Sequence, residues 1–498
     1  MIEGVCRIRL GGGRGPHERG DGSGGFNGNR GDNQDVKDAS AGDPCSKGGS
    51  SGSNPTSGNP IVLSTGDKVE PETDFVSAGE MPLSLQRTYN HYWNYPGLFG
   101  KYWVSSFDYT LVWQTVGTDI EALIFAQRPD GRRIKFVRVS TTNRWNEDKA
   151  NPIAYIIKNA DSTWSLFAED DVTEQYGGDG RPLMVTNAHG IGWNFTYANN
   201  YLSQVTHTSG RSVQFTWTSG QLTQVTAPGG SVFSYTYTAN AFGSGLHRLA
   251  SSTSPAATGN PAVTISYFYE DARYPGGVTG KAFNGVRYST FAYDGSARAV
   301  DSEHVTGGID RFTYVYNGTP TSPPNPPPPP PPPGVHCDPV THHCPLPPVV
   351  TDPNEDPAQI ALNAKQAAAE DAVVSMVTAT QTSTVETNPL GLQTTYTFLD
   401  GKLSSTSGAA SAHCSARSKS RSYDTNGNED LVTDFNGNYT NTNYAANGQL
   451  QQKIEGYNSA VARTTTYIWD STGHNRPTSI TVAGDHKTRE AGPQIQPP

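Results

Sequence analysis

The sequence lacks the features that mark several common classes of protein. No stretch approaches the roughly 18 consecutive apolar residues of a membrane-spanning helix. The first residues, MIEGVCRIRLGGG, contain no apolar signal-peptide core. Asp and Glu (46) outnumber Lys and Arg (36), and the net charge is −10, whereas a nucleic-acid groove needs clustered positive charge. We therefore predict neither a membrane span nor a nucleic-acid partner.

Catalytic motifs are also missing. The chain has no Gly-x-Ser-x-Gly elbow and no His-Glu-x-x-His pattern. The neighbouring acids Asp170 and Asp171 resemble a glycosidase carboxylate pair, but they stand in a polar loop sequence, AEDDVTEQYGGDG, where solvated charge is the better interpretation. We predict that the protein is not an enzyme and has no catalytic residues and no cofactor.

Metal-binding patterns are weak. The chain has five cysteines, too few for a disulfide framework and odd in number. In HCDPVTHHC, Cys337 and Cys344 could bind zinc with His342 or His343, but structural zinc sites usually space their cysteines by about two to four residues. A local disulfide or two free thiols fits this wider spacing better. The sequence therefore predicts no metal site there and leaves the state of the two cysteines open.

A second pattern, DTNGNED, looks like the start of a calcium loop. Asp424, Asn426 and Asn428 occupy its alternate positions. Glu429 and Phe435, however, stand where such a loop needs glycine and glutamate. Because Asn-Gly is a strong hairpin signal, we predict a turn between two strands rather than a calcium site.

Aromatic and small polar residues are abundant, with 24 Tyr and 8 Trp but only 4 Met. Aromatic and β-branched side chains suit pleated sheets, so the composition favours an all-β protein. Residues 1–57 are mostly Gly, Ser, Asn and Asp, with almost nothing to bury, and are predicted to be disordered.

An internal repeat of twenty residues organises the middle of the chain. YANNYLSQVTHTSGRSVQFTW (197–217) aligns with WTSGQLTQVTAPGGSVFSYTY (217–237). Within a unit, Val213, Phe215 and Trp217 alternate with polar residues, and turn signals such as NN, SG and GG separate the alternating runs. This pattern predicts antiparallel hairpins that are buried on one face and stack on their neighbours.

The theme returns nearer the C-terminus. Tyr423 and Tyr444 are 21 residues apart in YDTNGN and YAANGQL, and YIWDSTG follows at 467–473. Each unit is predicted to have an aromatic strand, an Asn-Gly or Asp-Gly turn, and a short strand closed by Leu or Ile. Further strands are predicted at 262–269, 287–293 and 311–316.

A proline-rich insert separates the two arrays. Eight consecutive prolines predict a polyproline II rod of roughly 25 Å, and proline cannot join a sheet ladder. The following DPAQIALNAKQAAAEDAVVSMVTA predicts one helix over 357–379. Its expected apolar side contains Ile360, Ala364, Ala367 and Val374.

These patterns divide the chain into seven segments. They are a disordered segment (1–57), an N-terminal β domain (58–180), β-repeats (181–317), a polyproline linker (318–356), a helix (357–379), further repeats (380–484) and a disordered tail (485–498).

Aromatic residues on the strands have two possible roles. They are Trp217, Tyr235, Tyr237, Tyr267, Tyr269, Tyr314 and Tyr316. Exposed, they could stack on sugars; buried, each would remove roughly 150–250 Å² from water and hold the sheet together. The second interpretation is favoured, with a glycan surface as the alternative.

The motifs resemble those of the RHS (rearrangement hotspot) or YD-repeat family. YDTNGN, YAANGQL and YIWDSTGHNRPTSIT resemble its repeat, and GNPIVLSTGDKVEPETDF, MPLSLQRTYN and GLFGKYWVSSFDYTL (within 58–111) resemble the module that opens these proteins. The residues that match in this module are Asn59, Pro60, Thr65, Gly66, Asp67, Lys68, Glu72, Asp74, Phe75, Leu83, Arg87, Tyr89, Asn90, Gly100, Trp103 and Asp108.

This resemblance implies a mainly antiparallel β spiral or partial shell around an effector. Family shells enclose a C-terminal toxin, which is delivered to competing cells. The family's closing core motif, its aspartate-based self-cleavage segment and a toxin domain are not found before the final HKTREAGPQIQPP. We therefore expect a truncated, non-enzymatic member, secreted or on the surface of a bacterium, whose partner is a toxin domain or a secretion component. The alternative is a surface adhesin that binds carbohydrate.

Overall fold

The computed structural model describes residues 56–316 and 381–483, apart from short loop segments. Those segments are residues 92, 94–95, 117–118, 130–132, 141, 149–151, 169–170, 239–246, 258, 305–306, 400–401, 409–416, 425–427 and 471–476. All secondary structure in the described part is β, which confirms the predicted class, and no helix there could cross a membrane. The predicted helix at 357–379, the linker, both disordered ends and all five cysteines lie outside the described residues.

Most strands belong to one long antiparallel sheet, called the wall, in which each strand from β8 to β35 pairs with its neighbour in sequence. Its first strands are β8 (Thr110–Val116), β9 (Asp119–Gln127), β10 (Arg133–Arg138), β11 (Arg144–Glu147), β12 (Tyr155–Lys158), β13 (Trp164–Phe167), β14 (Thr173–Tyr176), β15 (Pro182–Thr186), β16 (Gly192–Ala198), β17 (Tyr201–His207), β18 (Ser212–Thr218), β19 (Gln221–Thr226), β20 (Val232–Thr238) and β21 (Arg248–Ser254). The wall continues with β22 (Val263–Phe268), β23 (Gly280–Phe283), β24 (Val286–Tyr293), β25 (Ala299–His304), β26 (Ile309–Tyr316), β27 (Gln381–Thr387), β28 (Gln393–Leu399), β29 (Lys402–Gly408), β30 (Arg417–Tyr423), β31 (Glu429–Thr433), β32 (Tyr439–Tyr444), β33 (Leu450–Glu455), β34 (Arg463–Trp469) and β35 (Pro477–Ala483).

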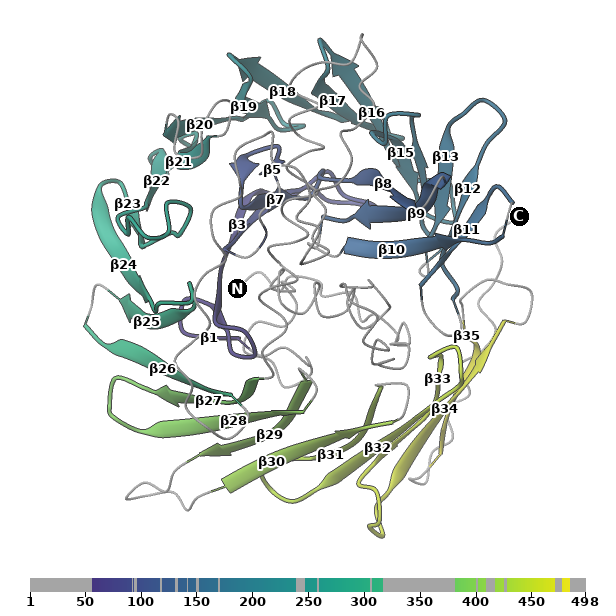
Figure 1. Ribbon diagram of the computed structural model, residues 1–498, viewed down its shortest axis with the longest axis vertical. Helices are drawn as coiled ribbons and strands as arrows, with labels where there is room; N and C mark the ends of the chain where they lie inside the picture. Colours follow the sequence, from purple (N-terminus) through teal and green to yellow (C-terminus); the bar gives the residue numbers. More distant parts are fainter. Residues whose placement is uncertain are drawn as a thin grey trace, which may run out of the picture.

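The wall curves round on itself, so that β35 returns toward the side of the strands where the wall begins (Figure 1). Among the described residues, no register of paired positions joins β35 to β8. The wall is therefore consistent with the open β spiral that the repeats predicted. Strands β26 and β27 pair directly although the proline-rich insert separates them in sequence.

The N-terminal strands form a separate module, which lies inside the curve of the wall (Figure 1). The module contains β1 (Thr56–Ser57), β2 (Ile61–Val62), β3 (Asp67–Phe75), β4 (Leu85–Asn90), β5 (Pro96–Gly97), β6 (Gly100–Lys101) and β7 (Trp103–Ser105). Five of its strands make a sheet in the order β1-β2-β3-β4-β7, and β5 pairs with β6. The largest apolar core joins the module to wall strands from β15 to β24.

The twenty-residue repeat forms the hairpins that its turns predicted. Asn199 and Asn200 have φ of 50° and 66°, and Ser219 and Gly220 have φ of 51° and 77°. Two successive left-handed residues make the tight turn that matches the twist of an antiparallel pair. The predicted alternation is also confirmed, because Val213 and Phe215 are buried while Gln214 and Thr216 are exposed.

A β-bulge recurs near the tight turns of these hairpins. Thr216 pairs with Gln224, but the next residue, Trp217, pairs with Leu222, so Thr223 is the extra residue of the bulge. The hydroxyl of Thr223 donates to the carbonyl of Thr216 at 3.2 Å. Equivalent serines at 203 and 404 donate in the same way. In these three hairpins, a hydroxyl residue that follows the leucine thus satisfies a backbone acceptor at the bulge.

Beside several of these bulges, an aromatic side chain reaches back to the preceding hairpin. Trp217 Nε1 donates to the Leu202 carbonyl at 2.8 Å, and the Tyr237 hydroxyl donates to the Leu222 carbonyl at 2.8 Å. Tyr197, Tyr269, Tyr293, Tyr314, Tyr423 and Trp469 make the corresponding bond. The repeat therefore specifies a hydrogen bond between units as well as a buried ring.

Replacing one of these donors should have a measurable cost. Tyr237→Phe keeps the ring but leaves the Leu222 carbonyl without its donor, and we expect a loss of about 1 kcal/mol in the free energy of unfolding. Urea unfolding measures it. Tyr288→Phe is the matched control, because that ring is 36% exposed. Equal effects of the two variants would show that the bond between units is unimportant.

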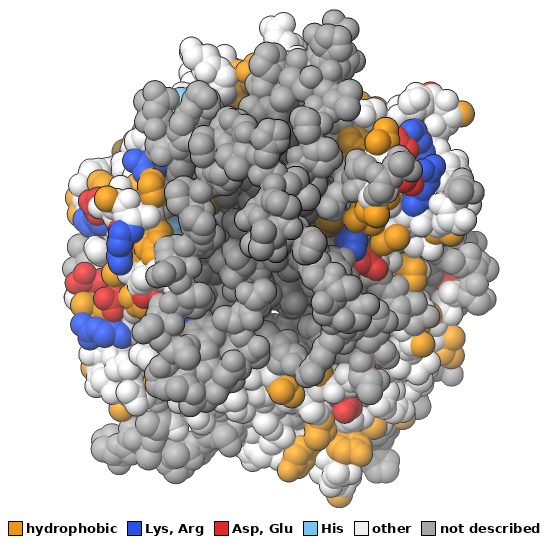
Figure 2. Space-filling model, viewed as in Figure 1, with side chains coloured by type: hydrophobic (Ala, Val, Ile, Leu, Met, Phe, Trp, Pro, Cys, Tyr) orange, Lys and Arg blue, Asp and Glu red, His pale blue; other side chains and the backbone are white. Residues whose placement is uncertain are grey.

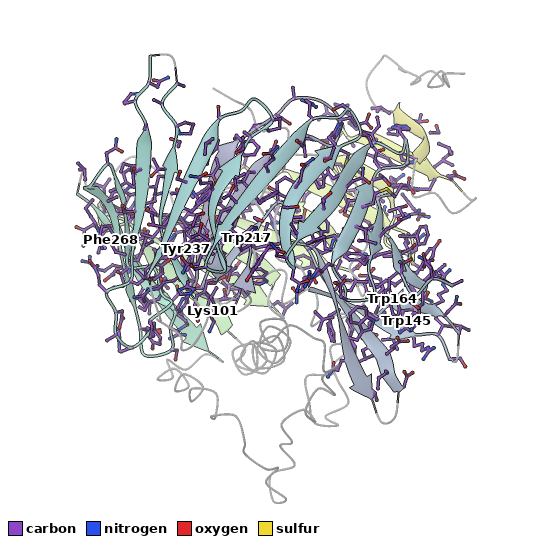
Figure 3. All side chains as sticks on the ribbon, turned by 90° about the horizontal axis from the view of Figure 1, so that it is seen from above. Lys101, Trp145, Trp164, Trp217, Tyr237 and Phe268 are labelled. Atoms are coloured by element: carbon purple, nitrogen blue, oxygen red, sulfur yellow. The ribbon has the colours of Figure 1, made fainter. Side chains whose placement is uncertain are left out.

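The first wall strands have a core of their own. Trp145 and Trp164 are almost fully buried and lie edge to face at 5.0 Å, with Trp113 on the other side of Trp164 at 5.4 Å. Figure 3 places Trp145 and Trp164 at the end of the wall away from Trp217 and Tyr237. This core packs the first wall strands together, and side chains of the module do not contribute to it.

Candidate functional site

The contact between the module and the wall is the most elaborate buried site in the described residues, and we call it the junction. Aromatic side chains of the module meet the aromatic side chains of successive repeats. Phe107 lies 5.7 Å from Phe215, and Phe99 lies 4.7 Å from Tyr235. Phe75 contacts Phe233 and Trp103 contacts Tyr267 in the same manner. Successive strands from β18 to β22 thus place buried rings against the module.

These contacts decide the role of most of the aromatic residues named from the sequence. Tyr235, Tyr267 and Tyr314 are buried, and Trp217, Tyr237 and Tyr269 are partly buried against the core. The rings hold the structure together, as favoured above, and offer no support for a glycan surface. The side chain of Tyr316 lies outside the described residues.

Arg87 of β4 is the central polar residue of the junction. Its guanidinium binds both carboxylate oxygens of Asp74, at 2.8 and 3.0 Å, and donates to Tyr267 at 2.9 Å and to Ser252 at 2.7 Å. The rings of Phe99, Trp103, Tyr235 and Tyr267 surround it within 6 Å. Although burial opposes the charge, Asp74 outweighs it and raises the pKa of Arg87. A permanent cation therefore joins the module to two wall strands.

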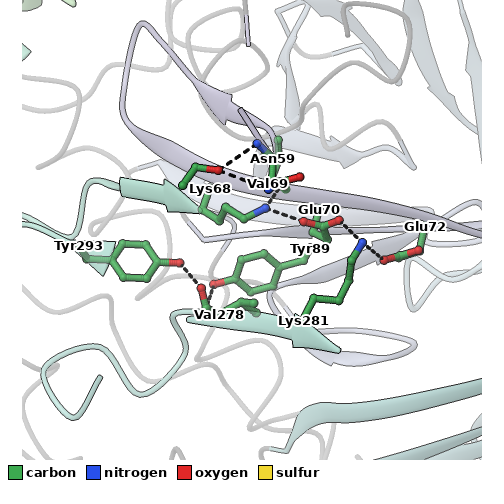
Figure 4. Close-up of polar contacts among 10 residues, drawn as sticks. Asn59, Lys68, Val69, Glu70, Glu72, Tyr89, Val278, Lys281 and Tyr293 are labelled. Carbon is green, nitrogen blue, oxygen red and sulfur yellow. Dashed lines mark hydrogen bonds and ion pairs between the residues drawn. The ribbon is translucent and has the colours of Figure 1, made fainter. Parts of the chain in front are cut away.

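A second buried network alternates in charge between β3 and β23 (Figure 4). Lys68 Nζ lies 2.7 Å from Glu70, Glu70 lies 2.6 Å from Lys281, and Lys281 lies 3.0 Å from Glu72. Burial lowers the pKa of Lys68. Burial would raise the pKa of Glu70, but the two lysines outweigh it and lower that pKa. Burial opposes the charge of Lys281 too, but Glu70 and Glu72 raise its pKa.

A third group surrounds His91, which follows β4. Its Nδ1 lies 3.0 Å from the Tyr89 hydroxyl, which donates to the Gly276 carbonyl at 2.7 Å and accepts from the Val278 amide at 3.0 Å. The Tyr293 ring stacks 4.8 Å from the imidazole (Figure 4 shows Tyr89, Val278 and Tyr293). Burial lowers the pKa of His91 to about 4, so the imidazole is neutral at pH 7.

Acidification should therefore weaken the junction through His91. The unfolded chain takes up a proton near pH 6.5, but buried His91 accepts one only near pH 4. Up to about 3 kcal/mol of stability is lost as the pH falls through this interval. Asp108, whose pKa burial raises to about 6, acts in the opposite direction. Urea unfolding between pH 7 and 4 should show a stability profile for His91→Phe that falls less than that of the wild type. Parallel profiles would contradict this.

The module also sends a segment, residues 76–84, across the hairpin turns of the wall; we call it the strap. Glu80 Oε1 lies 2.6 Å from Asn187 Nδ2 and 3.1 Å from His189 Nδ1. Arg211 donates to the Ala78 carbonyl at 3.0 Å, and Trp193 Nε1 donates to the Met81 carbonyl at 2.8 Å. Residues between β15 and β18 thus bind the strap through two of its backbone carbonyls and through Glu80, its one acidic residue.

The sequence analysis names Lys68, Glu72, Asp74, Arg87 and Tyr89 only as matches to a family's opening module and predicts no junction with the wall. The structure brings these five residues to the junction, where Lys68, Arg87 and Tyr89 are buried and Glu72 and Asp74 are half-buried. On the wall's side, the sequence predicts a core or glycan-binding ring for Tyr267 and no role for Ser252, Lys281 and Tyr293. Glu70 and His91 of the module were missed as well. The sequence offers one signal for the wall's side of the junction, which is Lys281 in the short run GKAF. An isolated charge on a buried strand is normally paired, so this lysine indicates a buried acidic partner.

The other candidates lie away from the junction. Asp171 stands in a turn, and Asp170 lies outside the described residues. Asp424 accepts the Asn428 amide at 2.8 Å within the link between β30 and β31, whose pairing confirms the predicted hairpin; Asn426 is not among the described residues. In the described part of the chain, no three His, Cys, Asp or Glu side chains gather as metal ligands would. The described charged side chains of the junction pair with each other. This arrangement suits attachment of the module to the wall.

One comparison with known proteins matches the region of the module. Residues 58–136 match the family described as "Domain of unknown function (DUF6531)". This match covers the module and continues into β10. No curated protein is similar enough to count as a match.

Several of the similar solved structures are of TcdB2-TccC3, and a porin-like protein is also among the matches. The crystal structure of TcdB2-TccC3 without its hypervariable C-terminal region has 9% identity and a TM-score of 0.34, covering 86% of this chain and 23% of that one. The structure of TcdB2-TccC3 has 11% identity and a TM-score of 0.29, covering 87% and 25%. The chain thus spans about a quarter of the length of these proteins. At such scores the similarity carries no detailed argument, and the fold rests on this chain's own strand pairing.

Proposed function

We propose that this protein is a non-enzymatic shell of the RHS/YD-repeat type, which wraps an effector polypeptide. The observation that carries the proposal is the continuous wall of hairpins, which curves around an N-terminal module and is attached to it by a buried junction. Such a wall gives each hairpin two neighbours that cover it, which a lone hairpin lacks. The module at 58–111 is proposed to be the family's opening module.

The chemistry of the chain supports a container over an enzyme. The junction's charges pair with each other, and the aromatic rings pack a core. On the visible face, acidic and basic side chains are intermingled where residues are described (Figure 2), so this part of the surface shows no patch of one sign that would collect a charged substrate. We propose further that the shell acts outside or on the surface of a bacterium, with a toxin domain or a secretion component as its partner.

Protection of a fused reporter would test enclosure. A small soluble reporter placed after Pro498 should be digested at least tenfold more slowly by protease than the same reporter inserted between Gly229 and Gly230. Those glycines form an exposed hairpin turn with open space around them. Equal digestion rates, with the wall shown to be intact by circular dichroism, would contradict the enclosing role.

A further inference from the structure

The face of the wall that meets the module changes in chemistry along the chain. Two residues and four residues before the aromatic side chain at a bulge, the repeat places residues on this face, as Phe215 and Val213 stand before Trp217. In the next hairpin the same positions hold Tyr235 and Phe233. All four side chains are buried, and the module packs against them.

The same positions are polar in the last strands, β30 to β35, which we call the wall end. Before Tyr423 they hold Arg421 and Lys419, and in the hairpin that follows both are threonines. Among the described residues of 404–483, Leu450 is the one apolar residue with a buried side chain. Burial of apolar surface is the main favourable term in folding, so the wall end gains less from this face than the strands under the module do.

Charged side chains of the wall end pair within their own hairpins. Arg421 of β30 binds Glu429 of β31 at 2.8 Å, and Lys453 binds Glu455 of the same strand at 3.0 Å. The apolar clusters that the module shares with the described wall extend no farther along it than Leu403 of β29. In the described part of the chain, the wall end is therefore held mainly by contacts between neighbouring strands.

The last hairpin, β34 and β35, has the fewest such contacts. β34 pairs with β33, and Trp469 Nε1 donates to the Leu450 carbonyl at 2.7 Å. β35 pairs with β34, and no other strand among the described residues has a register of paired positions with it. In an array whose units contact only their neighbours, the last unit can open without disturbing the others.

We propose that the wall end is a gate, which opens hairpin by hairpin from β35 while the module and the strands packed on it stay folded. Parts of a protein with few buried apolar contacts open at a lower free energy than its core. The opening follows from the packing alone, whereas its use, the passage of a wrapped polypeptide, rests on the shell function proposed above. Such a gate leaves the junction intact.

Hydrogen exchange of the full chain at pH 7, followed by mass spectrometry of its peptides, measures the opening. After correction for the intrinsic rate of each sequence, amides of β32 to β34 should exchange at least about tenfold faster than those of β18 to β20. Within the wall end, the last hairpin should exchange fastest and the hairpin of β30 and β31 slowest. Equal protection of the wall end and of β18 to β20 would overturn the proposal.

A matched pair of substitutions tests whether the opening is local. Trp469→Phe removes the bond to the Leu450 carbonyl, and exchange should become about threefold faster in β34 and β35 alone. Trp217→Phe removes the same bond, to the Leu202 carbonyl at 2.8 Å, under the module. Its effect should spread over the module and β15 to β24, because their shared core makes them one cooperative unit. If the effect of Trp469→Phe spread equally to β18 to β20, the proposal would be wrong.

The fused-reporter measurement separates failure of the gate from failure of the shell. A protected reporter together with uniform exchange along the wall would reject the gate and leave the shell function in place. Fast exchange of the wall end together with an unprotected reporter would reject the shell function, and with it the use of the opening as a gate. A protected reporter together with fast, local exchange at the wall end is the result that we expect.

Discussion

Arg87→Met is expected to destabilise the protein by about 3–5 kcal/mol, because it removes one partner of a buried ion pair and leaves the other without its counter-charge. Asp74, whose side chain is 7% exposed, would lose its two bonds from the guanidinium. Ser252 and Tyr267 of the wall would lose their link to the module at the same time. Urea unfolding should show a lower midpoint. A separate early transition would indicate that the module leaves the wall first.

Arg287→Met is the matched control for this prediction. Arg287 also binds a carboxylate with two nitrogens, at 3.0 and 2.9 Å from Glu270, but that glutamate side chain is 57% exposed. Solvated pairs contribute about 0–1 kcal/mol, so the control should unfold close to the wild type. Arg87→Lys should recover only part of the loss, because an ammonium cannot reproduce the two parallel bonds. If both Met variants lost the same stability, burial of the junction would not be the cause.

The regular part of the fold could be predicted from the sequence because it depends on residues that are close together in the chain. Strands, turns and the buried face follow from a period of two within a period of twenty. The bulge was not predicted, although it leaves a trace. Leu202 and Val205 are both buried despite an odd spacing, and an extra residue between them, Ser203, makes this possible.

The junction could be predicted only on the module's side. The charged residues of the module stand within one short stretch and match a known motif. Their partners do not: Lys281 is 211 positions from Glu70, and Tyr267 is 180 positions from Arg87. The short sequences GKAF and SYFY contain no feature that predicts which strand of the repeated wall will face the module. That choice depends on how far the wall has curved when it reaches the module, which the length of several loops sets together.

The buried lysine–glutamate network leads to the second large effect, which is expected for Glu70→Ala. Glu70 is shared by two lysines, at 2.7 Å from Lys68 and 2.6 Å from Lys281. Without it, Lys68 remains fully buried beside the Phe291 ring with no other described carboxylate at bonding distance, while Lys281 keeps Glu72. We expect a loss of about 3–5 kcal/mol in the free energy of unfolding.

The pH dependence gives this prediction a second measurement. The lowered pKa of Glu70 contributes stability that is present above its unfolded pKa of 4.5 and lost as the pH falls through its lower folded pKa. Glu70→Ala should therefore lose more stability at pH 7 than at pH 3. The control is Glu455→Ala, because Lys453 and Glu455 have the same spacing on a strand and lie 3.0 Å apart, with side chains 39% and 44% exposed. It should cost at most about 0.5 kcal/mol at either pH. A similar cost for both variants would mean that strand spacing, rather than burial between module and wall, sets the strength of these pairs.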